Sequence, residues 1–276
     1  MVSTVERNPN MNRKLGVIAS CTAPFVDELD ILPEIRDVGF DCFFTGRYQL
    51  EDVRALKKRA DEVGLEFETI HAPFANINAM WLPGMAYLDI YNKMITSIDS
   101  AAECGVPTVV THLSSGWAAP EVNDLGLSRF DSLVIHAQKR GVTLAFENLR
   151  KIGNLAYIVD RYENVKNVGF CYDFGHGHCY TKTVDWMDIY LNRVACTHIH
   201  DNHGRGMEKV GDPDQHLLPF DGTVDYERIV RKLDEYGYAG PLTLEIGMCA
   251  TEEYKKMTPR AFLEDAYARI KKISLL

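Results

Sequence analysis

Eight short runs of strand-forming residues alternate with eight helix-length segments, and this alternation leaves few folds open to the chain. The runs expected as strands lie at 15–19, 40–44, 65–71, 107–112, 142–147, 168–173, 195–203 and 241–245. Segments with apolar residues at helical spacing follow them, at 25–38, 50–63, 85–104, 122–139, 154–163, 184–193, 224–236 and 259–272. Strict alternation of this kind predicts parallel strands joined by right-handed crossovers.

Glycines mark the ends of five of the expected helices, at Gly39, Gly64, Gly105, Gly141 and Gly237. Glycine is the usual residue after a helix because it adopts the left-handed conformation without strain. Eight such units in 276 residues favour a single-domain (β/α)8 TIM barrel over an open, doubly wound sheet. No G-x-G-x-x-G follows the first strand, which counts against a dinucleotide-binding fold. We expect the barrel domain over 15–276, after a disordered polar lead-in over 1–14.

Charge and composition narrow the classes of partner. The net charge of −9 gives the chain no overall basic surface for nucleic acid or an anionic membrane. No apolar run approaches the roughly 20 residues of a membrane span, and the first residues lack the apolar core of a signal peptide. The seven cysteines are scattered without a C-x-x-C, which is typical of reduced thiols. We therefore expect a cytoplasmic protein with no membrane partner, and its oligomeric state stays open, a homo-oligomer included.

Titratable side chains gather where the expected strands end. Eight of the nine histidines lie at or after a strand end, and only His136 lies inside an expected helix. Chance placement would spread them over both ends of the strands and over the helices. Since a TIM barrel carries its chemistry at the C-terminal ends of its strands, these side chains should meet at one mouth.

Four of these residues form the best candidate for a metal site. A strand-end histidine is by itself more often a packing residue, and an aspartate there can simply bond turn amides. A buried carboxylate at the end of an apolar strand, as at Glu245, is costly unless it is paired or metal-bound. Mixed oxygen and nitrogen ligands suit Mn²⁺, Co²⁺, Zn²⁺ or Mg²⁺. The candidate ligands, from four consecutive strands, are Glu147, Asp173, His198 and Glu245.

Such a site predicts a particular chemistry. A divalent cation can bind vicinal sugar oxygens, polarise a carbonyl and stabilise an enediolate. Two glutamates facing each other across the substrate can remove a proton from carbon and return one. Such chemistry is that of a metal-dependent isomerase or epimerase of a carbohydrate, with Glu147 and Glu245 as the proton-transfer pair, and the family resemblance described next makes this our prediction.

Short motifs at the strand ends also carry a family resemblance. The chain from residue 15 onward resembles the xylose isomerase-like TIM barrels, which include sugar and sugar-phosphate isomerases and epimerases, and endonuclease IV. The resemblance implies that Glu147, Asp173, His198 and Glu245 hold one ion, and that His176 contacts substrate. It favours His198 as the ligand in its segment, with His200 beside it in a supporting role. The motifs are AFENLR, CYDFGHGH, THIHDN, DPDQHLLPFDGTVDY and LTLEIG.

The likeness to endonuclease IV widens the candidate site. That enzyme's trinuclear zinc site implies further ligands here, so the expected number of ions is one to three. The chain departs from its local signatures, since the first strand runs into IASCTAPF and the sixth into CYDFGHGH. The additional candidate ligands are His71, His112, His176, Asp214 and His216.

Substrate-binding candidates and the alternatives complete the prediction. His176, Arg205 and Trp117 are expected to contact a small-molecule carbohydrate. Ketose epimerases carry a second substrate-binding glutamate where this chain has Gly153, so the sugar should be bound differently. The alternatives are an endonuclease IV-like abasic-site phosphodiesterase and a related barrel lyase or dehydratase. The modest number of basic residues in the mouth loops leaves nucleic acid as the less favoured partner.

Overall fold

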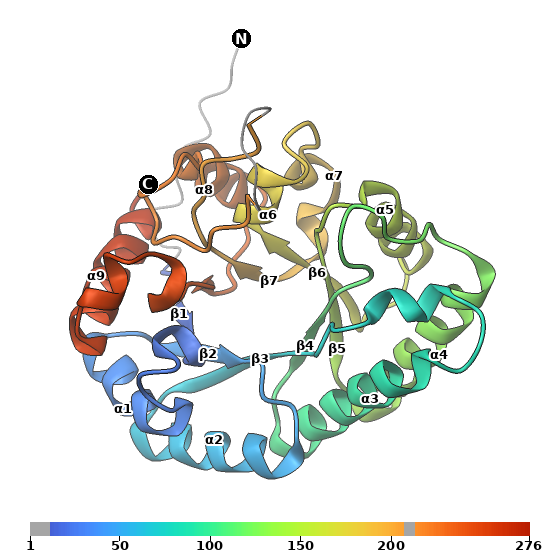
Figure 1. Cartoon of the computed structure of the whole chain (residues 1–276), viewed down its shortest axis with the longest axis horizontal. Helices are drawn as coiled ribbons and strands as arrows, with labels where there is room; N and C mark the ends of the chain where they lie inside the picture. Colours follow the sequence, from blue (N-terminus) through green and yellow to red (C-terminus); the bar gives the residue numbers. More distant parts are fainter. Residues whose placement is uncertain (1–11, 207–212) are drawn as a thin grey trace.

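The computed structural model describes residues 12–206 and 213–276, and within them eight parallel strands form one sheet. The strand order is β7-β6-β5-β4-β3-β2-β1-β8, and a bridge between Ile199 and Leu244 joins the two ends into a barrel (Figure 1). The fold is therefore a single (β/α)8 TIM barrel, as predicted. The strands are β1 Leu15–Ile18, β2 Cys42–Thr45, β3 Glu66–His71, β4 Thr108–Thr111, β5 Thr143–Glu147, β6 Val168–Asp173, β7 Val194–His198 and β8 Leu242–Leu244.

The helices surround this ring of strands (Figure 1). They are α1 Glu28–Val38, α2 Leu50–Val63, α3 Tyr87–Cys104, α4 Asp124–Arg140, α5 Ile152–Arg161, α6 Phe174–Cys179, α7 Trp186–Tyr190, α8 Tyr226–Glu235 and α9 Pro259–Ser274. The helix expected at 184–193 is shorter than predicted, because α7 passes into a 3-10 turn, Leu191–Arg193, before β7. The sequence did not predict the short α6, which begins directly after Asp173 and whose first turn that carboxylate caps.

Two features of the turns set the strand positions. Gly64 and Gly141 both have φ of 72°, in the left-handed region, so the helix-to-strand turns predicted at these glycines are confirmed. At the start of α1, the side chain of Asp27 accepts a hydrogen bond from the Leu29 amide and caps the helix. The two glycines therefore end α2 and α4 on the side of the barrel opposite the mouth, and Asp27 begins α1 on the mouth side.

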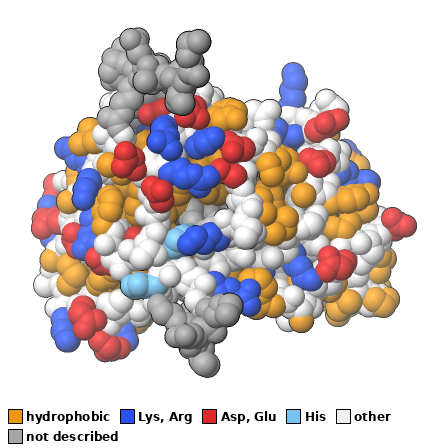
Figure 2. Space-filling model, turned by 90° about the horizontal axis from the view of Figure 1, so that it is seen from above, with side chains coloured by type: hydrophobic (Ala, Val, Ile, Leu, Met, Phe, Trp, Pro, Cys, Tyr) orange, Lys and Arg blue, Asp and Glu red, His pale blue; other side chains and the backbone are white. Residues whose placement is uncertain are grey.

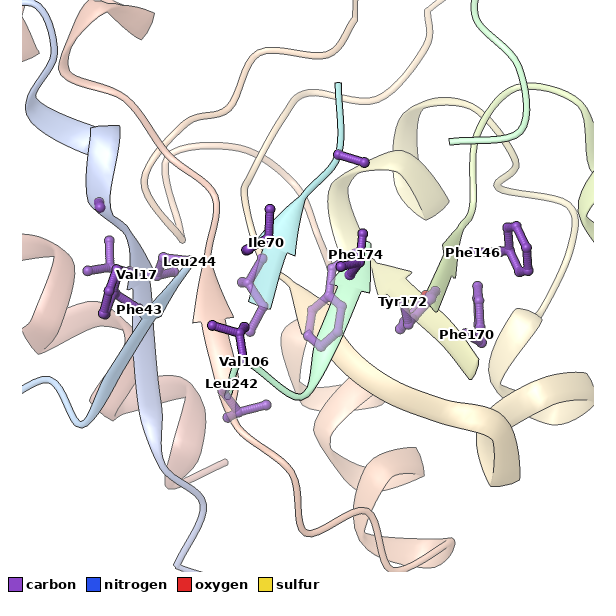
Figure 3. Packing of buried hydrophobic residues seen from close by; sticks show 14 of the residues in the cluster. Val17, Phe43, Ile70, Val106, Phe146, Phe170, Tyr172, Phe174, Leu242 and Leu244 are labelled. Carbon is purple, nitrogen blue, oxygen red and sulfur yellow. The ribbon is translucent and has the colours of Figure 1, made fainter. Parts of the chain in front are cut away.

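The main hydrophobic core lies between the strands and the helices. Val17, Phe43, Ile70 and Leu244 are fully buried members of this layer, one from each of four neighbouring strands (Figure 3). The barrel interior is lined differently. A small cluster of Val110, Ala145, Cys171 and Cys196 fills its β4-to-β7 side, and polar residues occupy the other side.

The contacts of the barrel begin before β1. Residues 1–11 of the expected lead-in lie outside the described residues. Arg13, however, is buried, donates to the Tyr238 carbonyl at 2.8 Å and pairs with Asp234 at 2.6 Å. Contacts with the barrel therefore begin two residues before residue 15, where we expect the domain to begin. Among the described residues, no helix is both long enough and apolar enough to cross a membrane.

Candidate metal centre

Glu147, the last residue of β5, stands at the centre of the barrel mouth. Its carboxylate is fully buried, and its two oxygens face different partners. Oε2 lies 3.2 Å from Nε2 of His71 and 2.8 Å from Nε2 of His112, at the ends of β3 and β4. Oε1 lies 3.1 Å from Nδ1 of His198, at the end of β7. One carboxylate therefore joins two neighbouring groups of ligand-type side chains.

Two sets of ligand-type side chains extend from this point. We call the first the inner group: Glu147, Asp173, His198 and Glu245. One ligand atom from each lies within 4.8 Å of all the others. Nδ1 of His198 is 3.1 Å from Oε1 of Glu147 and 3.2 Å from Oε2 of Glu245. All four residues predicted as primary ligands are thus brought together, on strands β5 to β7 and directly after β8.

The second set, which we call the loop group, consists of His176, His200, Asp214 and His216. Asp214 is at its centre, with Oδ2 3.1 Å from Nε2 of His176 and Oδ1 3.3 Å from Nε2 of His216. The rings of His200 and His216 stack at 4.0 Å. His200 also lies 3.2 Å from Asp173 of the inner group, so the two groups are adjacent.

A buried aspartate brings the loop back to the mouth. Asp201 pairs through its backbone with Leu217, and its carboxylate accepts hydrogen bonds from the amides of Phe220 and Val224. This folds the 213–225 segment over β7, although His216 must adopt a positive φ of 47°. A non-glycine residue in that region is strained, and such strain is found preferentially at functional sites.

Gly175 makes room for the buried imidazole of His200. A Cβ at position 175 would lie 2.0 Å from the His200 ring, so no larger residue fits without displacing it. The sequence analysis gave His200 only a supporting role, whereas the structure places it fully inside the loop group. The alternation of side chains along an extended segment, which puts His198 and His200 on one side, was the signal that could have found it.

The charges of these groups depend on one another. Burial alone would raise the pKa of Glu147, but the charge of His198 and a hydrogen bond from His112 hold it well below its usual value. Glu245 behaves in the same way, with its pKa lowered by His198 and His216. Burial would lower the pKa of His198, but the two glutamates raise it well above its usual value.

The loop group repeats this pattern. Despite burial, Asp173 and Asp214 raise the pKa of His176 well above its usual value. Asp214 and Glu245 raise the pKa of His216 to about 9. The mouth is therefore a dense array of carboxylates and imidazoles that compensate one another's charge.

The donor set fits a divalent ion. Two ligand atoms that are each about 2.1 Å from one ion lie about 3.0–3.5 Å apart, which is the spacing of Nδ1 of His198 from the two glutamates. Oδ2 of Asp173 and Oε2 of Glu245 are buried and lack a hydrogen-bond partner among the described residues. Nδ1 of His198 is hydrogen-bonded to Oε1 of Glu147, whereas its approach to Oε2 of Glu245 is not a hydrogen bond. Close approach without a hydrogen bond is expected of atoms that share a cation, because buried polar atoms are otherwise paired.

Aromatic and basic side chains form a wall beside the loop group. The His176 ring stacks on Tyr180 at 5.3 Å, Tyr180 meets Trp117 edge-on at 5.7 Å, and the Arg205 guanidinium lies 4.1 Å from the centre of the Trp117 ring. The three predicted substrate-binding residues therefore lie together. Trp117 is 46% exposed, so part of its surface is open to a ligand.

On the other side of the mouth, Phe74 stacks on His112 at 4.3 Å and is 45% exposed. The sequence analysis did not single out Phe74, although the predicted strand end His71-Ala-Pro-Phe contained it.

Comparison with known proteins shows the family to which the chain belongs. The family model for the xylose isomerase-like TIM barrel matches residues 32–265. The chain belongs to this family. A relative from Sinorhizobium fredii, the uncharacterized protein y4fM, is 32% identical over 165 residues, which cover 55% of this chain and 50% of the relative. The uncharacterized protein MJ1311 of Methanocaldococcus jannaschii is 24% identical over 80% of this chain and 82% of its own length.

Solved structures of epimerases share the fold. The 3-keto-D-glucoside 4-epimerase YcjR of E. coli superposes with a TM-score of 0.71 and 16% identity, over 94% of this chain and 99% of that chain. The D-psicose 3-epimerase of Clostridium cellulolyticum, solved with D-tagatose, superposes with a TM-score of 0.72 and 15% identity, over 95% and 98%. At this level of identity the likeness shows that the chain shares its fold with these epimerases.

Proposed function

We propose that this protein is a divalent-metal-dependent isomerase or epimerase of a sugar or sugar derivative. One observation carries the proposal: the carboxylates of Glu147 and Glu245 both approach Nδ1 of His198, at 3.1 and 3.2 Å. Two carboxylates that converge on a single point of the mouth can hold an ion and also reach a substrate bound there. The likeness to sugar epimerase structures supports the same reaction class.

The inner group would hold the ion. Glu147, Asp173, His198 and Glu245 offer three carboxylates and one imidazole, and this set suits Mn²⁺, Co²⁺, Zn²⁺ or Mg²⁺. When bound, a divalent ion supplies a Lewis acid that polarises a carbonyl oxygen. The histidine pair His71 and His112, with Glu147, and the loop group could hold a second and a third ion.

The two glutamates would move the proton. One carboxylate takes a proton from the carbon beside the substrate carbonyl and becomes a carboxylic acid. In an isomerase this same acid returns the proton to the neighbouring carbon; in an epimerase the second glutamate, after it has taken a proton from water, returns one to the opposite face while the first gives its proton to water. Their lowered pKa values keep both carboxylates ionised at neutral pH, as a base requires. Proton transfer of this kind contributes about 10²- to 10⁴-fold to a rate.

The wall beside the loop group would bind the sugar. The exposed part of Trp117 offers an apolar surface for the C–H face of a sugar ring, and Arg205 and His176 offer hydrogen bonds to its oxygens. Pockets for small polar ligands commonly combine aromatic walls with a few placed polar groups. The sugar would therefore lie between the wall and the two glutamates.

The test is hydrogen exchange at carbon. The wild-type chain, loaded with Mn²⁺ or Co²⁺, is incubated in D₂O with a panel of ketoses and ketose phosphates, and NMR follows the substrate C–H signals. We expect loss of one C–H signal beside the carbonyl of at least one sugar. Glu245→Gln should abolish the exchange, whereas Glu66→Gln, an exposed glutamate of β3, should leave it unchanged.

A second candidate is metal-dependent cleavage of a phosphodiester at an abasic site. The loop group and the histidine pair favour it, because together with the inner group they offer ligands for more than one ion, as many phosphodiester hydrolases require. The net charge of −9, however, gives the chain no overall basic surface for a nucleic-acid backbone. On the side of the barrel shown in Figure 2, basic and acidic side chains are interspersed. Nicking of abasic DNA without exchange on any sugar would contradict the favoured function.

A further inference from the structure

A polar layer lies inside the barrel, beneath the mouth, and the proposed reaction does not use it. Glu68 of β3 is buried, and its Oε2 accepts a hydrogen bond from the Thr243 hydroxyl of β8 at 2.5 Å and one from the Cys42 thiol of β2 at 3.6 Å. Gly16 of β1, between Cys42 and Thr243, leaves the space for this contact, since a Cβ there would lie 2.7 Å from the Cys42 sulfur. We call these four residues the barrel floor.

Two contacts place the barrel floor next to His198. Thr243 is bonded to β7 on both sides of His198, through the Thr197 hydroxyl and through the Ile199 amide at 2.8 Å. Phe44, two residues after Cys42 on β2, stacks on the His198 ring at 4.5 Å. The carboxylate of Glu68 contacts both Cys42 and Thr243, so it lies close to His198.

The side chains of His198 and Glu68 each have one buried polar atom without a hydrogen-bond partner among the described residues. Among the described residues, neither Nε2 of His198 nor Oε1 of Glu68 has a hydrogen-bond partner. Nδ1 of His198 faces Glu147 and Glu245, so an ion in the inner group would take the lone pair of Nδ1. A neutral imidazole that gives Nδ1 to an ion carries its proton on Nε2, and that proton then needs an acceptor.

We infer that Glu68 is a positioning residue for the inner group. Its carboxylate accepts a hydrogen bond from one enclosed water molecule, and that water accepts the Nε2–H of His198. A water molecule there would pair both unpartnered atoms, and enclosed waters typically make two to four such bonds. Metal-bound histidines commonly give their second N–H to a carboxylate, which fixes the ring and strengthens the ligand. Glu68 would do this from the opposite side of the barrel. The inference rests on the proposed metal centre.

The test measures binding of Co²⁺ by competition with a chromophoric chelator, in four variants beside the wild-type chain. Glu68→Gln keeps the shape of the side chain and removes its charge, and we expect the Kd for Co²⁺ to rise about 10- to 100-fold. The matched control is Glu66→Gln, two residues away on β3 and exposed, which should change Kd less than about twofold. His198→Ala and the double variant His198→Ala/Glu68→Gln complete a cycle.

The cycle separates a positioning role from a structural one. If Glu68 acts through His198, the change Glu68→Gln should have no further effect on Kd in the His198→Ala background. An unchanged Kd in Glu68→Gln, or the same loss with and without His198, would overturn the inference and leave the metal centre intact. If the wild-type chain binds no Co²⁺, or if His198→Ala leaves its Kd for Co²⁺ unchanged, the proposed metal centre is contradicted, and the inference about Glu68 is contradicted with it.

A second measurement needs no change at Glu68. In the wild-type chain loaded with Zn²⁺, the Nε2 proton of His198 should exchange slowly with solvent. It should therefore give a separate ¹H–¹⁵N signal in the NMR spectrum, and the loss of this signal in His198→Gln assigns it. Fast exchange of this proton in the loaded chain would contradict an enclosed hydrogen bond to Glu68.

Discussion

Glu147 at the barrel mouth and Glu68 in the barrel floor are both buried glutamates inside the same barrel, and their pKa values shift in opposite directions. Burial raises the pKa of Glu68 to about 7, and the Thr243 hydroxyl and the more distant His198 offset it only in part. At Glu147 the same burial is outweighed by His198, His112 and His176, and the pKa falls well below its usual value. Burial therefore does not decide the charge of a carboxylate here; the number of imidazoles in contact with it does.

This difference separates two functions of the interior. The mouth holds its carboxylates ionised with a ring of histidines, as ligands and bases require. The barrel floor holds a carboxylate near the point of ionisation, where a nearby positive charge changes its state. A cation bound at the mouth would therefore lower the pKa of Glu68 in the barrel floor.

The largest expected effect is from removing the charge at the mouth. Glu147→Gln takes away a proposed ligand, a proposed base and the shared partner of His71 and His112. We expect the exchange rate in D₂O to fall by about 10²- to 10⁴-fold, together with a weaker Co²⁺ affinity. Parallel assays of Glu66→Gln serve as the control. Exchange within about twofold of wild type would remove Glu147 from the proton-transfer pair.

The second expected effect is on the pH dependence of metal binding. The pKa of His216 is raised to about 9, so in the metal-free chain its imidazole is protonated at neutral pH. An ion that binds a ring nitrogen of His216 must displace a proton, and His176 of the same group must lose one as well. The affinity of the loop group should therefore rise at least about tenfold per pH unit between pH 6 and pH 8. Calorimetry in buffers of different ionisation enthalpy counts the protons released. An affinity that is constant from pH 6 to 8 would contradict a role for His216.

A third prediction concerns stability without metal. The folded-state pKa of Glu68 is raised from 4.5 to about 7, so the penalty for its charge is absent below pH 4.5, grows as pH rises, and is complete above pH 7. Glu68→Gln removes this penalty and should raise the free energy of unfolding at pH 8 by up to about 3 kcal/mol. Urea unfolding in the presence of EDTA measures it. Equal effects at pH 4.5 and pH 8 would show that the charge of Glu68 is not responsible.

The smallest effect is expected at the wall. Trp117→Ala should raise KM about tenfold with little change in kcat, because it removes a surface that the bound sugar and the transition state contact equally. The exposed Tyr157 of α5 provides a matched control, since Tyr157→Ala removes an aromatic ring away from the mouth. A fall in kcat alone would mean that Trp117 acts on the reacting atoms rather than on the substrate as a whole.

The sequence by itself determined the architecture and most members of the centre. Alternating strands and helices with glycine-ended turns specify a parallel barrel, because these signals are local. Because the strand ends of such a barrel meet at one mouth, the sequence alone predicts that Glu147, Asp173, His198 and Glu245 lie together. The structure brings together these four, and also the histidine pair and the loop residues Asp214 and His216.

Only the tertiary structure decided how these residues are divided. That Glu147 gives one oxygen to His198 and the other to His71 and His112 depends on its rotamer in a packed interior. His200 joins the loop group because Asp201 folds a distant segment back over β7. Glu68 lies close to His198 because its side chain reaches from β3 across to Thr243 of β8, and no local pattern in the sequence records how far a side chain reaches inside the barrel.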